Sequence, residues 1–101
     1  MAFKFEQLDV WKRAIDYTNA IHNTTLNFPK SELFILTSQI KRAADSIALN
    51  LAEGSTGQSN LEFNKFCGYA LRSTIEVVSC LYIAKKRALI DEKTFTMKPK
   101  F

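Results

Sequence analysis

Glycine and proline are scarce in this chain, which has three glycines and two prolines among 101 residues. So few turn-forming residues exclude a β-sandwich or β-barrel, in which tight turns join many short strands. No apolar run approaches the ~20 residues that a membrane-spanning helix needs, and the N-terminal stretch MAFKFEQLDV does not resemble a secretory signal. We therefore expect residues 1–101 to form a single all-α domain in the cytoplasm, without a membrane segment.

Histidine and cysteine are also scarce, and their spacing is typical of neither an active site nor a metal site. The one histidine, His22, has no glutamate three residues before it, which the di-iron carboxylate bundles require. Cys67 and Cys80 lack C-x-x-C spacing. On one helix they would lie roughly 20 Å apart, which is beyond the reach of a disulfide. We therefore expect no enzymatic activity, no cofactor and no metal, and two buried free thiols.

The spacing of apolar residues predicts three long helices and a short C-terminal segment. The expected ranges are about 10–27, 31–53 and 60–88, followed by 91–101. Asp9 is expected to cap the first helix, and Pro29 to end it, because proline disfavours helical geometry in the residue before it. Gly54 suits a left-handed cap at the end of the second helix. Ser59 and Glu62 form a capping box that begins the third helix.

Each of the first two helices has one apolar face, built from residues that recur at steps of three or four. In the first helix we expect the buried face to contain Trp11, Ala14, Ile15, Thr18 and Ile21. In the second helix the corresponding residues are Leu33, Leu36, Ile40, Ala44, Ile47 and Leu51. These two faces are therefore predicted to pack together in the core.

The third helix has two apolar faces, about 100° apart around its axis. One face contains Phe63, Phe66, Ala70, Thr74, Val77, Leu81, Ala84 and Ala88. The other contains Leu61, Gly68, Leu71, Ile75, Val78, Tyr82 and Leu89. A helix with two buried faces lies at the centre of its fold, and three helices supply few partners. We expect another subunit to cover the second face, and the alternative cover is the segment 91–101.

The chain has a formal net charge of +4, and its cations gather on the third predicted helix. Lys65, Arg72 and Lys86 fall at heptad-related positions, and Lys85 and Arg87 flank the last of them. One interpretation is a solvated face whose cations complement the dipole at the C-terminal end of the helix. The other is a surface that binds nucleic-acid phosphates without reading sequence.

Arg42 lies at the edge of the apolar face of the second helix, and Glu76 lies among apolar residues of the third. We expect the two side chains to form a partly buried ion pair that fixes the register of the helices rather than adding much stability. A role for Arg42 in binding a ligand or nucleic acid is the alternative.

Four blocks of this sequence have a family's pattern and order. They are Phe5–Trp11, Phe28–Lys30, Ser38–Gly54 and Glu62–Phe66. Together they resemble the four-helix bundles of the 23S rRNA intervening-sequence proteins, or S23 ribosomal protein family, which is related to the accessory proteins of diversity-generating retroelements. The resemblance covers about residues 3–95. Two features depart from the family: Ala48 stands where proline is usual, and the chain ends just after the fourth helix should begin.

The resemblance implies an antiparallel up-down four-helix bundle with a curtailed fourth helix, assembled as a homopentamer. It also implies binding to rRNA or to other RNA or DNA, and a protein partner such as a reverse transcriptase. We therefore predict a non-enzymatic, basic, oligomeric bundle that binds nucleic acid through a cationic surface. Two alternatives stay open: a protein–protein interaction scaffold that does not bind nucleic acid, and a truncated family copy with little activity.

Overall fold

The computed structural model describes residues 3–57 and 59–96, and within them the fold is all-α, as predicted. Two short helical turns, η1 and η2, are of the 3-10 type, and a third, η3, is of the π type. In chain order the elements are η1 (Lys4–Gln7), α1 (Asp9–Thr25), η2 (Lys30–Glu32), η3 (Leu33–Thr37), α2 (Ser38–Ser55), α3 (Asn60–Lys86) and α4 (Glu92–Phe95).

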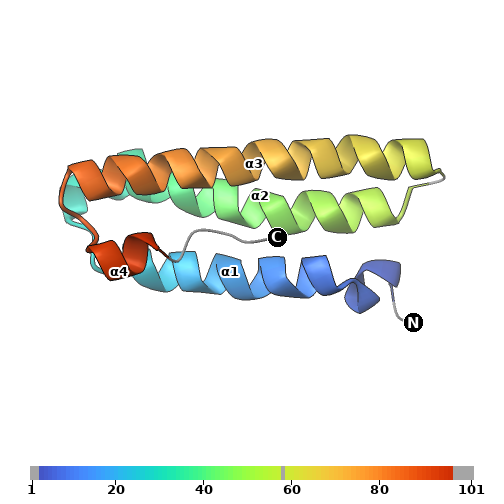
Figure 1. Cartoon of the computed structure of the whole chain (residues 1–101), viewed down its shortest axis with the longest axis horizontal. Coiled ribbons are helices and arrows are strands. Elements are labelled where there is room, and N and C mark those ends of the chain that lie inside the picture. The colour runs from blue at the N-terminus through green and yellow to red at the C-terminus, as the bar shows by residue number, and fades with distance from the viewer. Residues whose placement is uncertain (1–2, 58, 97–101) are drawn as a thin grey trace.

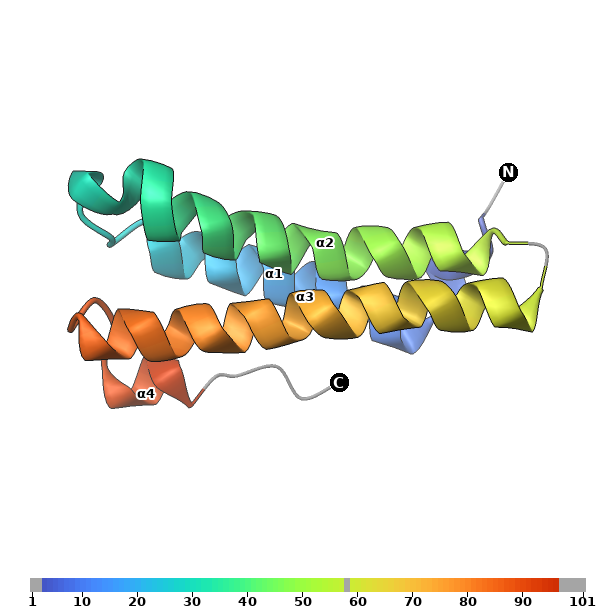
Figure 2. The ribbon, with the colours of Figure 1, turned by 90° about the horizontal axis from the view of Figure 1, so that it is seen from above.

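The long helices α1, α2 and α3 run up, down and up along a molecule of 44 × 23 × 22 Å (Figure 1). α2 packs against both α1 and α3. Seen from above, α4 lies beside α3 on the side away from α2, and in the first view it lies level with α1 (Figures 1 and 2). α4 therefore occupies one end of the fourth position of a four-helix bundle, and in the described residues this helix is only four residues long.

The core lies where α1, α2 and the first apolar face of α3 meet. Its most deeply buried large side chains are Leu36, Ile40, Ile47, Val77, Cys80 and Leu81. Two hydrogen bonds between helices fix their register: Thr18 Oγ1 donates to the Ala44 carbonyl oxygen at 3.0 Å, and Ser73 Oγ donates to Ser46 Oγ at 2.9 Å. The predicted faces are thus confirmed in the middle of each helix.

The prediction of buried residues is less accurate at the ends of these faces. Ile15 on α1 and Leu33 at the start of η3 are both exposed. Leu33 misses the core because the second helix does not begin as a regular α-helix. The chain makes a 3-10 turn and then a π turn, which changes the angle between successive side chains. From Ser38 onward the helix is regular and passes through the buried Ala48 without a break.

Two predicted caps are wrong and one is confirmed. Asp9 is the first residue of α1 rather than its cap, and the capping residue Leu8 makes no side-chain hydrogen bond. Gly54 is buried inside α2 with an ordinary helical φ. A Cβ atom at Gly54 would lie 2.6 Å from Phe66 Cβ, so this glycine permits a close approach of α2 to α3. Ser59 does cap α3, since its Oγ accepts from the Glu62 amide at 3.1 Å.

α4 shields only part of one end of the second apolar face of α3, where Tyr82 still exposes 56% of its surface. Near the C-terminal end of α3, the ring of Tyr82 meets that of Phe95 from α4 edge-on, with centroids 4.8 Å apart. Farther toward the start of the helix, Leu61, Leu71 and Ile75 are exposed, and Ile75 exposes 58% of its surface. Between this face and α1 lies an apolar groove lined by Val10, Ile47, Leu51, Phe63, Cys67, Ala70, Leu71 and Thr74. The segment 91–101 was the alternative expected cover for this face, and its residues 97–101 lie outside the described residues.

Candidate nucleic-acid interface

Three of the predicted cations form a stripe along the outside of α3. Lys65, Arg72 and Lys86 are all exposed, and α3 is unbroken from Asn60 to Lys86. A heptad step in a straight α-helix returns within about 20° of its starting direction, so the three side chains share one side. At 1.5 Å per residue the stripe is roughly 30 Å long. Within the described residues, no hydrogen bond or ion pair engages these three cations.

Lys85, a fourth candidate, is engaged in the fold. Its Nζ lies 2.7 Å from Glu92 Oε2 and 4.3 Å from the centre of the Phe95 ring. Both partners belong to α4, so Lys85 fastens this short helix to the end of α3. Because its Nζ is paired with Glu92 in the described residues, we exclude Lys85 from the stripe.

Arg87, the fifth candidate, is also engaged. Its Nη1 donates to Glu32 Oε1 and Oε2 at 2.9 and 3.0 Å, which joins the end of α3 to η2. The side chain of Glu32 is only 14% exposed, so the pair is more sheltered than an ordinary surface pair. Of the three consecutive cations Lys85, Lys86 and Arg87, only Lys86 has no ion-pair partner in the described residues. The stripe therefore consists of Lys65, Arg72 and Lys86.

The predicted ion pair between Arg42 and Glu76 does not form. Both side chains are exposed, and Glu76 Oε2 instead accepts a long hydrogen bond of 3.4 Å from Gln39 Nε2. Arg42 has no hydrogen-bond or ion-pair partner among residues 3–57 and 59–96. Because water reaches both charges at the outer edges of α2 and α3, neither has to be neutralised by the other.

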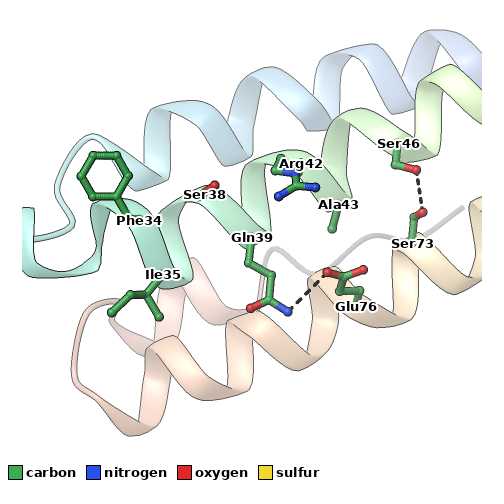
Figure 3. Close-up of a pocket in the computed structure, with 9 residues that line it drawn as sticks. All are labelled: Phe34, Ile35, Ser38, Gln39, Arg42, Ala43, Ser46, Ser73 and Glu76. Atoms are coloured by element: carbon green, nitrogen blue, oxygen red, sulfur yellow. Dashed lines mark hydrogen bonds between the residues drawn. The ribbon is translucent and has the colours of Figure 1, made fainter.

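Arg42 and Glu76 nevertheless line one pocket of about 630 Å³ between the start of α2 and α3 (Figure 3). The full lining is Phe34, Ile35, Ser38, Gln39, Arg42, Ala43, Ser46, Ser73 and Glu76. The hydrogen-bonded hydroxyls of Ser46 and Ser73 mark one end, and the exposed side chains of Phe34 and Ile35 mark the other. The pocket thus combines an unpaired cation, a carboxylate, several hydroxyls and an aromatic ring.

Residues 6–98 match the family described as 23S rRNA-intervening sequence protein. The chain belongs to this family. The resemblance carried by the four sequence blocks is therefore confirmed, and the family match covers every helix from α1 to α4. A search of the curated proteins found no match for the chain.

The potential metal ligands of this 23S rRNA-intervening sequence protein are scattered over the described residues. No group of three or more His, Cys, Asp or Glu side chains within residues 3–57 and 59–96 is placed to hold a metal ion. His22 is exposed on α1. Cys67 and Cys80 are both free; Cys80 is buried as predicted, and Cys67 is only half-buried. Burial, and secondarily the charge of Glu76, raises the pKa of the Cys80 thiol, which makes it a poor nucleophile.

In the described part of the chain, no helix combines the length and the apolar composition that a membrane crossing requires.

Proposed function

We propose that this member of the 23S rRNA-intervening sequence protein family is a non-enzymatic protein that binds nucleic acid, in the first place RNA, through the stripe on α3. The observation that supports the proposal most directly is that Lys65, Arg72 and Lys86 lie on one side of an unbroken helix and form no ion pair within the described residues. The family description, which refers to 23S rRNA, selects RNA as the first ligand to test.

The stripe suits a phosphate backbone better than a specific base sequence. Three cations spread over roughly 30 Å can contact several phosphates of one strand, but an exposed helix face has no pocket in which each base could be read. Binding of this kind is driven by the release of counterions from the nucleic acid. We therefore expect affinity that depends strongly on salt and weakly on sequence.

The first expected result concerns the salt dependence of the wild-type protein. Fluorescence anisotropy with a labelled single-stranded RNA should give a straight line of log affinity against log salt, with a slope of about −0.7 for each phosphate contacted. Unlabelled single-stranded DNA should compete with it. No binding at ~50 mM salt would contradict the proposal, because the counterion term is strong at such low salt. That result would favour the protein-interaction scaffold, with a partner such as a reverse transcriptase, or the copy with little activity.

The proposal includes an oligomer, and the family resemblance suggests five copies. It is supported by the open part of the second apolar face of α3, where Leu61, Leu71 and Ile75 are exposed. Exposed apolar residues gathered on one helix face mark a site where proteins associate. Repetition of the stripe around a symmetry axis would also let several weak contacts act on one strand at high effective concentration.

The second expected result is a stable oligomer in light scattering at micromolar concentration. Ile75→Asp should shift the protein toward the monomer, because it places a charge in the apolar contact. Asn19→Asp, on the exposed side of α1, is the matched control and should leave the mass unchanged. A wild-type protein that is monomeric at these concentrations would refute the oligomer and remove the basis for joint binding by several copies.

A further inference from the structure

The pocket between the start of α2 and α3 presents binding groups that the fold itself does not use. The guanidinium of Arg42 projects from α2 without a partner in the described chain, and the Phe34 ring beside the pocket is 89% exposed. Gln39 reaches across the groove to Glu76 on α3 (Figure 3). A cation and a large aromatic ring left in water beside a concave surface suggest a ligand that is both anionic and flat.

We infer that this pocket holds one unpaired nucleotide of a single-stranded nucleic acid, and this inference rests on the nucleic-acid binding proposed above. The phosphate is held by Arg42, the base stacks on Phe34, and the edge of the base donates hydrogen bonds to Glu76. Guanidinium groups bind phosphate oxygens in a bidentate manner, and aromatic rings stack unpaired bases of any sequence.

The size of the pocket agrees with this ligand. Its volume of about 630 Å³ falls within the range of roughly 300–1,000 Å³ that is common for small-molecule sites. The Ser38 hydroxyl lines the pocket between Phe34 and Arg42 and can bond to a ribose or phosphate oxygen. The pocket is therefore large enough to hold a single nucleotide.

Glu76 orients the nucleotide and selects its base. A carboxylate repels a phosphate and only accepts hydrogen bonds, so the phosphate must lie toward Arg42 and the base must turn a donor edge to Glu76. Guanine offers two adjacent donors on its Watson–Crick edge, whereas uracil offers one donor between two carbonyl oxygens. The pocket should therefore prefer guanine to uracil.

The stripe leads directly to this pocket. Arg72 stands four residues before Glu76 on α3, and side chains at this spacing are neighbours on a helix surface. A strand whose backbone follows the stripe can therefore turn one unpaired base into the pocket. The stripe supplies affinity that is independent of sequence, and the pocket adds a preference at one position.

The decisive experiment compares two RNA decamers in the same salt, one of uridines alone and one with a single central guanine. The wild-type protein should bind the guanine-containing strand more tightly.

Phe34→Ala should weaken binding of both strands by about tenfold, the typical loss of one stacking contact. Arg42→Gln should weaken both strands and lower the salt slope. Glu76→Gln should remove the preference for guanine without weakening the all-uridine strand. Leu49→Ala and Arg13→Gln, exposed positions outside the pocket, are the matched controls and should change little.

The outcomes separate this inference from the proposed function. If the wild-type protein binds RNA but the pocket variants bind both strands as it does, the pocket is not involved and the stripe alone explains binding. If the wild-type protein binds neither strand at low salt, the proposed function fails and the inference fails with it. If Phe34→Ala breaks the oligomer while the RNA affinity of each protomer is unchanged, the pocket is a protein contact and the inference is wrong.

A second measurement does not depend on a long strand. Guanosine 5′-monophosphate, added alone at millimolar concentration, should shift the NMR signals of Phe34, Gln39 and Arg42, and uridine 5′-monophosphate should shift them less. No shift at these residues, or equal shifts with both nucleotides, would contradict the base preference assigned to Glu76.

Discussion

Replacing Ile47 with alanine is expected to lower the free energy of unfolding by about 2–5 kcal/mol, the usual range for a buried isoleucine. Ile47 is 1% exposed and lies on the face of α2 that packs into the core. Removing its outer carbons leaves a cavity that the close-packed helices can fill only in part. A whole domain is stable by only ~5–15 kcal/mol, so this loss is a large fraction of the total. Urea denaturation followed by circular dichroism measures it.

Leu49 supplies the control for that measurement. It lies two residues farther along the same helix, but 64% of its surface is exposed. Leu49→Ala removes a similar number of carbons without creating a cavity, and its effect should stay within about 0.5 kcal/mol. Equal midpoints for the two variants would show that the orientation of α2 about its own axis is wrong, because a rotation of the helix would exchange the surroundings of these residues.

The middle of each helix was predictable from the sequence because burial there follows from periodicity alone. Ile40, Ala44, Ile47 and Leu51 recur at steps of three or four, and a regular helix places all of them on one side. The beginning of the second helix was not predictable in this way. The π turn over Leu33–Thr37 breaks the period, so Leu33 leaves the core although it fits the spacing.

Gly54 shows why the role of a residue near a helix end is difficult to predict from sequence. A glycine after a long apolar period is typical of a left-handed cap, and this was the expected role. Here the residue remains helical and serves the packing of α2 against Phe66 on α3. That role depends on a contact with a residue from another helix, which no local pattern contains.

The candidate site could likewise be predicted only where it depends on spacing within one helix. Heptad spacing alone predicted the common side of Lys65, Arg72 and Lys86. The acids that engage Lys85 and Arg87 could not be predicted from spacing. Glu92 meets Lys85 only because the chain reverses after α3, and Glu32 lies far from Arg87 in the sequence.

The pocket depends on how α2 and α3 lie side by side, so its shape could not be predicted from the sequence. One signal was present: Phe34 is a large apolar residue that does not fit the face defined by Leu36 and Ile40. An aromatic residue outside the buried period is either exposed by accident or placed for a contact. The exposed guanidinium of Arg42 in the same pocket favours the contact.

Changing Lys65, Arg72 and Lys86 together to glutamine is expected to reduce RNA affinity strongly at low salt and to flatten its salt dependence. Each protomer in contact with the strand loses up to three phosphate contacts, and the log–log slope should therefore fall by about 2 per protomer. If several protomers act on one strand, the losses add. Because these side chains are exposed and take part in no ion pair of the described chain, the variant should keep its thermal midpoint and its assembly state. Anisotropy over a salt series measures the slope, and light scattering verifies the assembly.

A second triple variant, with Lys4, Lys12 and Arg13 changed to glutamine, separates the position of the charge from its amount. It removes the same number of cations from exposed positions on η1 and α1 instead of α3. If the stripe is the interface, this control should lose much less affinity than the α3 variant, since distant surface charges are screened over about 8–10 Å at physiological salt. An equal loss of RNA affinity in both variants would mean that affinity depends only on the net charge of the protein. Unchanged binding by a folded, assembled α3 variant would place the interface on another surface.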